Sequence, residues 1–303
     1  MFDIDGVLLR GKTPLSEAAS SLLKLTNASV PWILMTNGGG ETEASKAAAL
    51  TKILGVSVHE RQIVLSHTPM QPLCASLGAS KVLVLGCRDV RGVARAYGLT
   101  NALTAADVHA DDPSIYPFLP APTPPVRFSE QLRAQKWAAV LVLHDPNSWG
   151  LEIQVAIDVL RGGGSGSKQV VPLYCSNGDL TFAGAHPVER LAAGAFSVAL
   201  KAAWAATVRS DKALEATFFG KPETAQFDYA AKHLTKWSGV EKFSRIVMVG
   251  DNPKADVRGA NRAGAPWISV LVRSGLWRGY DNDEEDPAHH VVDGVGDAVR
   301  KFL

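Results

Sequence analysis

The strongest constraint on the fold of this chain is the alternation of short apolar runs with longer amphipathic stretches. Six runs rich in Val, Ile or Leu are predicted to form buried strands, at residues 32–36, 82–86, 139–143, 170–175, 246–250 and 267–272. Five longer stretches have helical patterning, at residues 41–54, 149–160, 188–206, 223–236 and 254–263. Pro187 and Pro222 stand where two of these helices begin. Strands that alternate with helices favour a parallel sheet covered on both faces, so the predicted fold class is α/β.

Two stretches interrupt this order and indicate a second domain. Residues 110–127 contain six prolines, and residues 161–168 have the sequence RGGGSGSK, so neither stretch is predicted to be regular structure. Both lie in the middle third of the chain, where strand–helix units continue. We therefore predict an α/β domain inserted at residues 75–205 between two parts of one core, residues 1–74 and 206–303.

The charge balance and the cysteines exclude some classes of protein. The 303 residues include 31 Lys and Arg against 30 Asp and Glu, and a net charge of +1 gives no electrostatic reason to expect nucleic acid or a membrane surface as a partner. No apolar run is long enough to cross a bilayer. Cys74, Cys87 and Cys175 are in no metal-ligand spacing and favour a reducing compartment. The chain is predicted to be a soluble intracellular protein.

The start of the chain is unusual for a parallel sheet. Only Met1 and Phe2 precede the first acidic residue, Asp3. A buried strand usually has more apolar residues, so the first strand is either very short or begins further upstream in the natural protein. A removed targeting segment would account for the second alternative.

Asp3 and Asp5, in the sequence FDIDG, form the first candidate site motif. Residues two apart on an extended strand point to the same side, so both carboxylates could face one site where the strand ends, with Gly6 permitting a sharp turn. Ligands of open α/β sheets bind at the carboxyl ends of the strands. Two carboxylates this close repel each other, so the pair predicts a cation between them, and oxygen ligands suit Mg²⁺. A surface turn rich in Asp and Gly is the alternative.

Two further motifs could contact phosphoryl oxygens. Thr36, Asn37 and Gly38 follow a predicted strand, and a hydroxyl with amide groups can donate hydrogen bonds to a phosphate. Lys221 precedes the helix-starting Pro222 and could neutralise phosphate charge or restrain a carboxylate. Taken alone, these motifs are better explained as an ordinary turn and a surface lysine.

The last motif, Gly250-Asp251-Asn252, follows the strongly apolar residues 246–249. Asp251 at a strand end is a natural metal ligand. Asp256 lies in the first turns of the next helix and could support Asp251 from behind. A favourable charge near a helix start is the alternative for Asp256.

The order Asp-x-Asp, Thr, Lys, Asp–Asp, with each motif at a strand end, resembles the haloacid dehalogenase (HAD) superfamily over essentially the whole chain. The resemblance implies that Asp3 is a catalytic nucleophile and that Asp5 is its general acid and base. Members with an aspartate two residues after the nucleophile resemble phosphatases and phosphomutases rather than dehalogenases. A carboxylic acid at Asp5 could protonate the leaving alkoxide and then activate water.

The same resemblance assigns the other motifs. Thr36 and Lys221 are implied as catalytic, phosphate-binding residues, together with Asn37 and Gly38. Mg²⁺ is implied as the cofactor, held by Asp3, Asp251 and the main-chain carbonyl of Asp5. Asn252 and Asp256 are implied to support these ligands.

The position of the inserted domain, between the Thr36 and Lys221 motifs, is similar to the type-2 caps of the subfamily of nagD-like and p-nitrophenyl phosphatases. The segment HDPNSW at residues 144–149 is closer to the cat-eye-syndrome-region-protein-5-like branch, although His144 and Asp145 are interpreted as a cap loop rather than as catalytic residues. The resemblance implies a Rossmann-like core with a parallel sheet, a mitochondrial or cytoplasmic location, and pairing of two copies into a homodimer.

The predicted function is hydrolysis of a small phosphomonoester by a Mg²⁺-dependent phosphatase, through an aspartyl phosphate. A phosphotransferase or phosphomutase with the same site is one alternative, and a non-catalytic binding or regulatory protein is another. The predicted partner is a small phosphorylated metabolite, with no nucleic acid and no membrane. The sequence does not name the substrate, because residues of the cap choose it.

Overall fold

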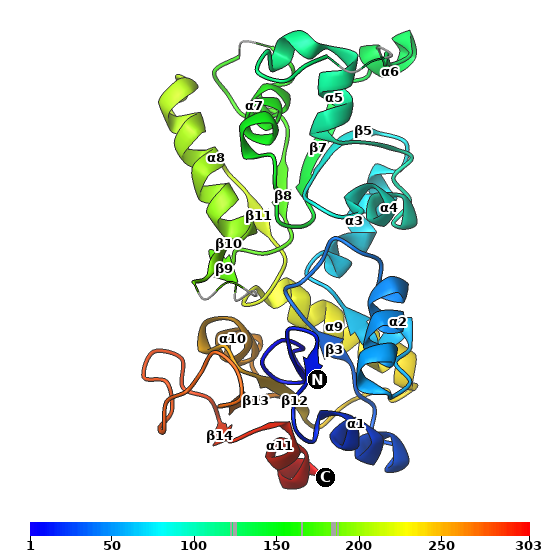
Figure 1. The fold of residues 1–303 in the computed structure, drawn as a ribbon, viewed down its shortest axis with the longest axis vertical. Helices are drawn as coiled ribbons and strands as arrows, with labels where there is room; N and C mark the ends of the chain where they lie inside the picture. Colours follow the sequence, from blue (N-terminus) through cyan, green and yellow to red (C-terminus); the bar gives the residue numbers. More distant parts are fainter. Residues whose placement is uncertain (122, 124–125, 165, 183–185, 187) are drawn as a thin grey trace. The chain divides into compact units, whose positions relative to one another are not determined.

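The computed structural model describes residues 1–121, 123, 126–164, 166–182, 186 and 188–303. The chain divides into two compact units (Figure 1). The core unit contains Met1–Gly38, Glu43–Pro69 and Phe219–Leu303, and the insert unit contains Gly39–Thr42 and Met70–Phe218. The insert unit therefore begins and ends at other residues than the predicted 75–205. It continues to Phe218 because a strand at Thr217–Phe218 pairs within its sheet.

The core unit is built on a parallel sheet that the start of the chain completes. Its strands are β3 (Leu34–Met35), β4 (Ile63–Val64), β12 (Ile246–Gly250), β13 (Trp267–Val272) and β14 (His290–Val292). Phe2 forms parallel bridges to Leu34 of β3 and to Val249 of β12, so the strand order is β14-β13-β12-Phe2-β3-β4. The amide of Asp3 donates to the Val249 carbonyl at 2.9 Å, which places Asp3 at the carboxyl end of this pairing.

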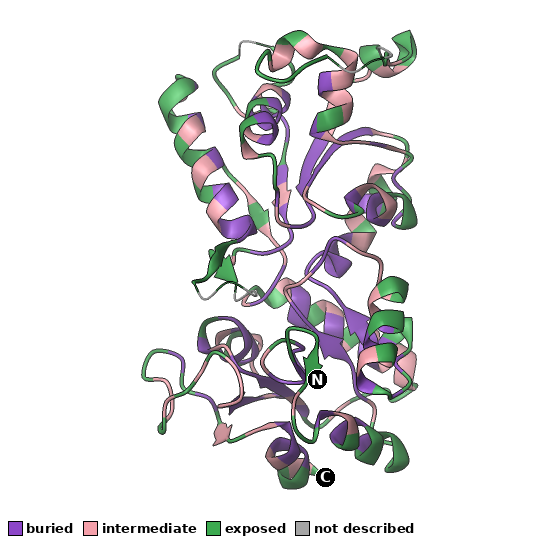
Figure 2. Cartoon of the chain, in the orientation of Figure 1, coloured by how far each residue is buried: buried purple, intermediate pink, exposed green. Residues whose placement is uncertain are grey.

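Alternation along these strands gives the sheet two apolar faces. Phe2, Leu34 and Val249 pack into one buried cluster with residues of the helices α1, α2 and α11. Met1, Met35 and Met248 pack into another cluster with residues of α9 and α10. Successive strand residues point to opposite faces, so the short apolar runs are buried on both sides. Figure 2 shows β3, β4, β12 and β13 as largely buried, the edge strand β14 as intermediate, and the outer sides of the helices as exposed.

The core unit also contains helices, short helical turns and a hairpin, and of these α2 and α9 lie close to the predicted bounds 41–54 and 223–236. The helices are α1 (Ala18–Asn27), α2 (Glu43–Leu54), α9 (Thr224–Ser238), α10 (Arg258–Ala263) and α11 (Val295–Phe302), with the short helical turns η1 (Glu60–Gln62), η2 (Thr68–Met70, whose last residue belongs to the insert unit) and η4 (Pro253–Val257) and the hairpin strands β1 (Leu9–Arg10) and β2 (Thr13–Pro14). The predicted helix at residues 254–263 is divided, because η4 is a π-helical turn that leads into α10.

The insert unit has a parallel sheet of its own. Its strand order is β11-β8-β7-β5-β6. The strands are β5 (Lys81–Leu85), β6 (Asn101–Leu103), β7 (Trp137–Val142), β8 (Leu173–Cys175) and β11 (Thr217–Phe218), with a separate antiparallel pair, β9 (Thr181–Phe182) and β10 (Arg190–Leu191). The helices are α3 (Gln71–Leu77), α4 (Val90–Ala96), α5 (Ala105–Asp111), α6 (Glu130–Ala134), α7 (Trp149–Leu160) and α8 (Ala193–Thr207), with the turn η3 (Pro113–Ile115). Each unit is therefore α/β with a central parallel sheet, as the sequence predicts.

Two predictions for the insert unit were wrong in detail. The helix predicted at residues 188–206 begins only at Ala193, because Arg190 and Leu191 pair with β9. The stretch 110–127, predicted to lack regular structure, begins with the end of α5 and the turn η3. Pro122, Pro124, Pro125, Ser165 and Pro187, on which parts of these predictions rest, lie outside the described residues.

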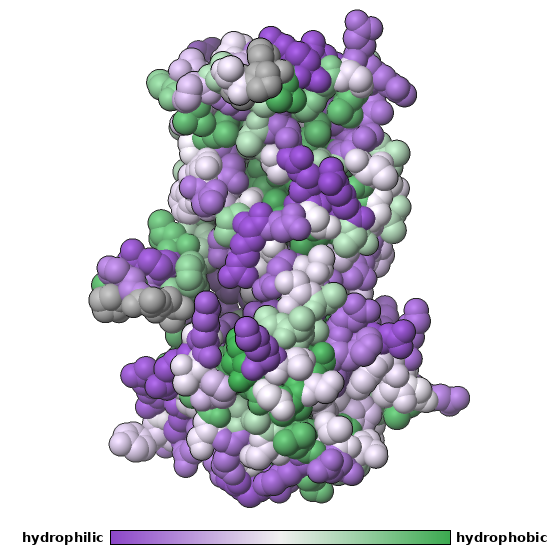
Figure 3. Space-filling model, turned by 45° about the vertical axis from the view of Figure 1, so that its right-hand side comes forward, coloured by the Kyte–Doolittle hydropathy of each residue, from purple (hydrophilic) through white to green (hydrophobic). Residues whose placement is uncertain are grey.

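The surface agrees with the balanced composition. Hydrophilic and hydrophobic residues are interspersed on the face drawn in Figure 3, and the mean hydropathy of the chain is +0.03. Among the described residues, no helix is both long enough and apolar enough to span a membrane.

Candidate active site

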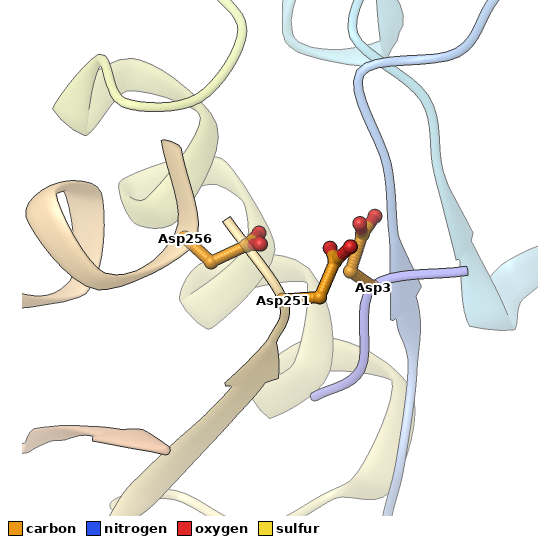
Figure 4. Close-up of side chains that lie close together, drawn as sticks. All are labelled: Asp3, Asp251 and Asp256. Atoms are coloured by element: carbon orange, nitrogen blue, oxygen red, sulfur yellow. The ribbon is translucent and has the colours of Figure 1, made fainter. Parts of the chain in front are cut away.

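Three buried aspartates converge at the carboxyl edge of the core sheet. Asp3 follows the Phe2 pairing, Asp251 follows β12, and Asp256 lies in η4. One carboxylate oxygen from each lies within 4.8 Å of the other two. Figure 4 shows the carboxylates of Asp3 and Asp251 side by side, with that of Asp256 pointing toward them. The third carboxylate of this cluster belongs to Asp256. The strand argument from the sequence instead pairs the carboxylates of Asp3 and Asp5.

Lys221 joins two of these carboxylates. Its Nζ lies 2.8 Å from Asp3 Oδ1 and 2.6 Å from Asp256 Oδ1, and it also donates to the Met35 carbonyl at 3.1 Å. The Lys221 side chain is only 2% exposed, so it is not the surface lysine of the alternative interpretation. One ammonium against three carboxylates leaves negative charge in the cluster, and Asp251 is the carboxylate that Lys221 does not pair with.

The charges shift the pKa values of the cluster. Burial, together with the charges of Asp3 and Asp256, raises the pKa of Asp251 to about 8. Burial also raises the pKa of Asp256 to about 6, although Lys221 acts in the opposite direction. Burial alone would lower the pKa of Lys221, but the charges of Asp256 and Asp3 outweigh it and raise this pKa above its usual value. The cluster therefore favours uptake of positive charge, either as a proton or as a cation.

The donor set fits a hard divalent cation. Carboxylate oxygens at the end of a strand, with excess negative charge, are the kind of ligand that Mg²⁺ prefers. Of the three carboxylates, Asp251 has the orientation best suited to bind such a cation. Its Oδ2 accepts a hydrogen bond from the Leu276 amide at 2.7 Å, which fixes the direction of the side chain.

Two glycines make room for the Asp251 carboxylate. A Cβ atom added to Gly6 would lie 2.1 Å from Asp251 Oδ2, and one added to Gly275 would lie 1.9 Å from the same oxygen. Gly6 also has a φ of +85°, which side chains rarely adopt. Glycine is therefore required at both positions by close approach to Asp251, and at Gly6 by the backbone as well.

Asp5 lies outside the buried cluster. Its side chain is exposed, and the chain turns immediately after Asp3, where the amides of Leu8 and Leu9 both donate to the Ile4 carbonyl. The argument that residues two apart face one side assumed an extended strand through Asp5. The bridges to β3 and β12 are made by Phe2, whereas Asp5 bridges Leu9 in the turn that follows. The assignment of Asp5 as general acid and base stays a prediction.

Thr36 and Asn37 lie beside Lys221. The Thr36 Oγ1 accepts a hydrogen bond from the Gly38 amide at 3.0 Å, which closes a tight loop after β3. The Asn37 side chain binds the backbone of Lys221 twice. Its Nδ2 donates to the Lys221 carbonyl, and its Oδ1 accepts from the Lys221 amide, both at 2.9 Å. These contacts hold the Asn37 side chain against Lys221, and a contact of Asn37 with phosphate stays a prediction.

Asn252 and Asp256 support the end of β12. The Asn252 amide donates to Asp256 Oδ2 at 3.1 Å, and Asn252 Oδ1 accepts from the Lys254 amide at 3.0 Å. One oxygen of the Asp256 carboxylate thus binds Lys221, and the other accepts from the backbone amide of Asn252, the residue after Asp251. This is the supporting position that the sequence predicted for both residues, next to Asp251.

Sequence reasoning missed Gln226, Gly275 and Leu276. Gln226 is fully buried and bonds to both Lys221 and Thr36. No motif singles it out, because a glutamine early in a helix is ordinary. Gly275 and Leu276 follow β13 within a Ser-Gly turn signal, which could have been noticed as one more strand end at the same edge.

Comparison with known proteins identifies the family of the chain. A model of haloacid dehalogenase-like hydrolases matches residues 1–100, and a HAD-hydrolase-like model matches residues 218–298. The mitochondrial hydrolase YKR070W of Saccharomyces cerevisiae is 32% identical over 100% of this chain and 94% of its own length. A cardiolipin synthase (CMP-forming) / mitochondrial hydrolase fusion protein of Schizosaccharomyces pombe is 35% identical, over 99% of this chain and 52% of the fusion protein.

Solved structures show the same fold at lower identity. The glycerol phosphate phosphatase Rv1692 of Mycobacterium tuberculosis, in complex with magnesium, has a TM-score of 0.69 at 19% identity, covering 98% of this chain and 74% of that one. NagD of Escherichia coli has a TM-score of 0.66 at 19% identity, covering 97% and 95%.

The two family models and the curated relatives identify the class of protein to which this fold and site belong. The chain belongs to the haloacid dehalogenase-like hydrolase family, and it is an enzyme of that class. The family prediction is therefore confirmed. Both relatives are named as mitochondrial hydrolases, which agrees with the mitochondrial location that the sequence resemblance implies.

Proposed function

We propose that this hydrolase is a Mg²⁺-dependent phosphatase that cleaves a small phosphomonoester through an aspartyl phosphate on Asp3. The observation that carries the proposal is the ion pair of Asp3 with the buried Lys221, beside the carboxyl group of Asp251, which Lys221 does not bind. Such a site keeps one carboxylate ionised as a nucleophile and collects positive charge where a phosphate dianion would bind. The glycerol phosphate phosphatase with the same fold supports a phosphomonoester as the substrate class.

In the first step, a carboxylate oxygen of Asp3 attacks phosphorus, and the bond between phosphorus and the ester oxygen breaks. The leaving alkoxide takes the proton of the Asp5 carboxylic acid. Lys221 and the Thr36 loop offset the charge on the phosphoryl oxygens. Lys221 also holds Asp3 in position, since its Nζ is fixed by Asp256 and by the Met35 carbonyl.

In the second step, water attacks the phosphorus of the aspartyl phosphate. The Asp5 carboxylate takes a proton from this water, the bond between phosphorus and Asp3 breaks, and inorganic phosphate leaves. The exposure of Asp5 is compatible with this role, because its proton must exchange with substrate and water rather than with the buried cluster.

Asp3 and Asp251 would hold Mg²⁺, with the main-chain carbonyl of Asp5. The ion would supply positive charge that lets an anionic nucleophile approach an anionic substrate. Asp256 is already bound to Lys221 and to the Asn252 amide, which favours a supporting role over direct ligation.

The test uses p-nitrophenyl phosphate, whose leaving group needs little protonation, and the variant Asp5→Asn. We expect the variant to release one equivalent of p-nitrophenol quickly, and then to stall with a phosphoryl group bound to the protein. Intact-mass analysis would detect that group, and peptide mapping would locate it on Asp3. Asp3→Asn serves as the control and should show neither the burst nor the added mass. Transfer of phosphate to an added alcohol, in place of release, would identify a phosphotransferase.

A further inference from the structure

Gln226 is a buried side chain that joins the two phosphate-binding segments of the core unit. It lies in the first turn of α9 and is 0% exposed. Its Oε1 accepts a hydrogen bond from the Lys221 amide at 2.7 Å, and its Nε2 donates to the Thr36 carbonyl at 3.1 Å. A single amide therefore spans two residues that are far apart in the sequence.

The two hydrogen bonds hold the backbone of Lys221 and of Thr36, whose side chains are proposed to bind the phosphoryl group. The Lys221 side chain extends from this backbone to Asp3. The Thr36 hydroxyl lies in the loop after β3, where it accepts from the Gly38 amide. The backbone of Lys221 has a second partner in Asn37, the residue next to Thr36. The loop after β3 and the Lys221 segment are thus connected three times through amide side chains.

A buried primary amide with both ends satisfied is a rigid spacer. Without Gln226 the Thr36 carbonyl would lose a buried partner at a desolvation cost, and the Lys221 amide would keep only its hydrogen bond to Asn37. The glutamine therefore helps to fix the spacing between Lys221 and Thr36. Catalytic side chains must be held within a fraction of an ångström of their productive geometry. We propose that Gln226 is a positioning residue that sets the distance between Lys221 and Thr36, and thereby the affinity for the phosphoryl group. This inference rests on the proposed phosphatase function only for its kinetic readout.

The chain offers a matched control at the other end of the same strand. Gln62 is also buried, at 7% exposure. Its Nε2 donates to the Trp32 carbonyl at 3.3 Å, and its Oε1 accepts from the His59 amide at 3.0 Å. Trp32 precedes β3 and Thr36 follows it, so the two glutamines make the same kind of bridge at opposite ends of β3.

The experiment compares Gln226→Met with Gln62→Met in the full-length protein. Both variants lose two hydrogen bonds from a buried amide and should lower the midpoint of urea unfolding to a similar degree. With p-nitrophenyl phosphate and Mg²⁺, only Gln226→Met should lower kcat/KM, by about 10-fold to 100-fold. Its dissociation constant for inorganic phosphate, measured by calorimetry with Mg²⁺, should rise about 10-fold, while Gln62→Met stays within about twofold of the wild type.

A second variant covers the case in which Gln226→Met does not fold. Gln226→Glu has the same shape and still accepts from the Lys221 amide, but it replaces the donor that faces the Thr36 carbonyl. We expect it to weaken phosphate binding as well, by less than the methionine variant does.

Equal losses of phosphate affinity in the Gln226 and Gln62 variants, or no loss in either Gln226 variant, would overturn the proposal. If the wild type bound inorganic phosphate but hydrolysed no ester, the phosphatase function would fail, and the calorimetric comparison would still decide the role of Gln226. If the wild type bound no phosphate, both would fail.

Discussion

The core and insert units have the same kind of parallel sheet, but they treat the acidic residues at their strand ends differently. In the insert unit, Asp145 follows β7 and accepts from the Ala193 amide at the start of α8, at 2.8 Å. Glu152, in the first turn of α7, accepts from the Ser148 amide at 2.7 Å and from the Gly86 amide at 3.4 Å. These carboxylates stabilise turns and helix starts.

In the core unit, the corresponding edge gathers carboxylates around one ammonium. Lys221 binds Asp3 and Asp256, and the carboxyl group of Asp251, which Lys221 does not bind, completes the cluster. The difference shows that an acidic residue at the end of a parallel strand is a poor guide to chemistry by itself. What distinguishes a site is whether backbone amides compensate the charge one residue at a time, or whether several charges remain coupled.

The largest effect that would test this contrast is expected from Asp3→Asn. The variant keeps the shape of the side chain and lowers the repulsion in the cluster, so the fold should remain intact. Hydrolysis of p-nitrophenyl phosphate should fall by about 10,000-fold or more, because the nucleophile is lost. Steady-state kinetics with circular dichroism as the folding control would check this. Substantial remaining activity would contradict the role of Asp3.

Lys221→Met should have the next largest effect. The matched control is the same substitution at a buried lysine of the insert unit. Lys221→Met removes the partner of two buried carboxylates, which costs about 3 to 5 kcal/mol in the free energy of unfolding, and kcat should fall by about 100-fold or more. Lys81 is also buried and lies 4.4 Å from the centre of the Trp137 ring.

Lys81→Met should alter stability without changing kcat. Urea unfolding and initial rates on both proteins would make the comparison. A similar loss of kcat in the two variants would show that the rate depends on stability in general and not on the charge beside Asp3.

The raised pKa values of the core cluster predict a pH dependence in the metal-free protein. A carboxyl group whose pKa is higher in the folded state binds its proton more tightly there than in the unfolded chain. The free energy of unfolding should therefore fall as the pH rises from about 4, the ordinary value of an aspartate, through about 6 for Asp256 and about 8 for Asp251.

Urea midpoints in EDTA across this range would measure the effect. Asp251→Asn should flatten the upper part of the curve, since its amide does not titrate, and Mg²⁺ should restore stability to the wild type at alkaline pH. An unchanged slope in the variant would mean that other groups carry the dependence.

The smallest effect is expected from Glu152→Gln in the insert unit. The two backbone amides donate to different oxygens of Glu152, and the glutamine amide has only one acceptor oxygen. One of the two hydrogen bonds is therefore lost, and the free energy of unfolding should fall by about 1 to 3 kcal/mol. Because burial raises the pKa of Glu152, replacing its charge costs less than it would on the surface. Rates should be unchanged within error. A large loss of activity would contradict a structural role for this carboxylate.

Much of the fold follows from the sequence because buried parallel strands are short and apolar. The strands β12 and β13 and the helix α7 have the predicted bounds, and Lys221 and Asp251 lie beside Asp3 as the order of motifs indicated. These features depend on local patterning and on the rule that parallel strands share a carboxyl edge.

The features that could not be predicted depend on contacts between distant segments. Asp5 is exposed because the chain leaves the central sheet after Phe2 and Asp5 bridges Leu9 in a turn. Strand periodicity does not show where the pairing with the sheet ends. Arg190 and Leu191 fit a helical pattern, and their pairing with Thr181 and Phe182 outweighs it. Gln226 is recognisable only once Lys221 and Thr36 are seen on either side of it.

The pairing of Phe2 with both Leu34 and Val249 has a consequence for the order in which the protein is built. The strand that carries Asp3 cannot complete its sheet until residue 249 is available, so Asp3 is fixed in place only after most of the chain has been synthesised. The insert unit lies almost entirely within residues 70–218 and needs no later segment for its own sheet. During synthesis on the ribosome, the insert unit would therefore fold first, and the core sheet with its aspartate cluster would form last.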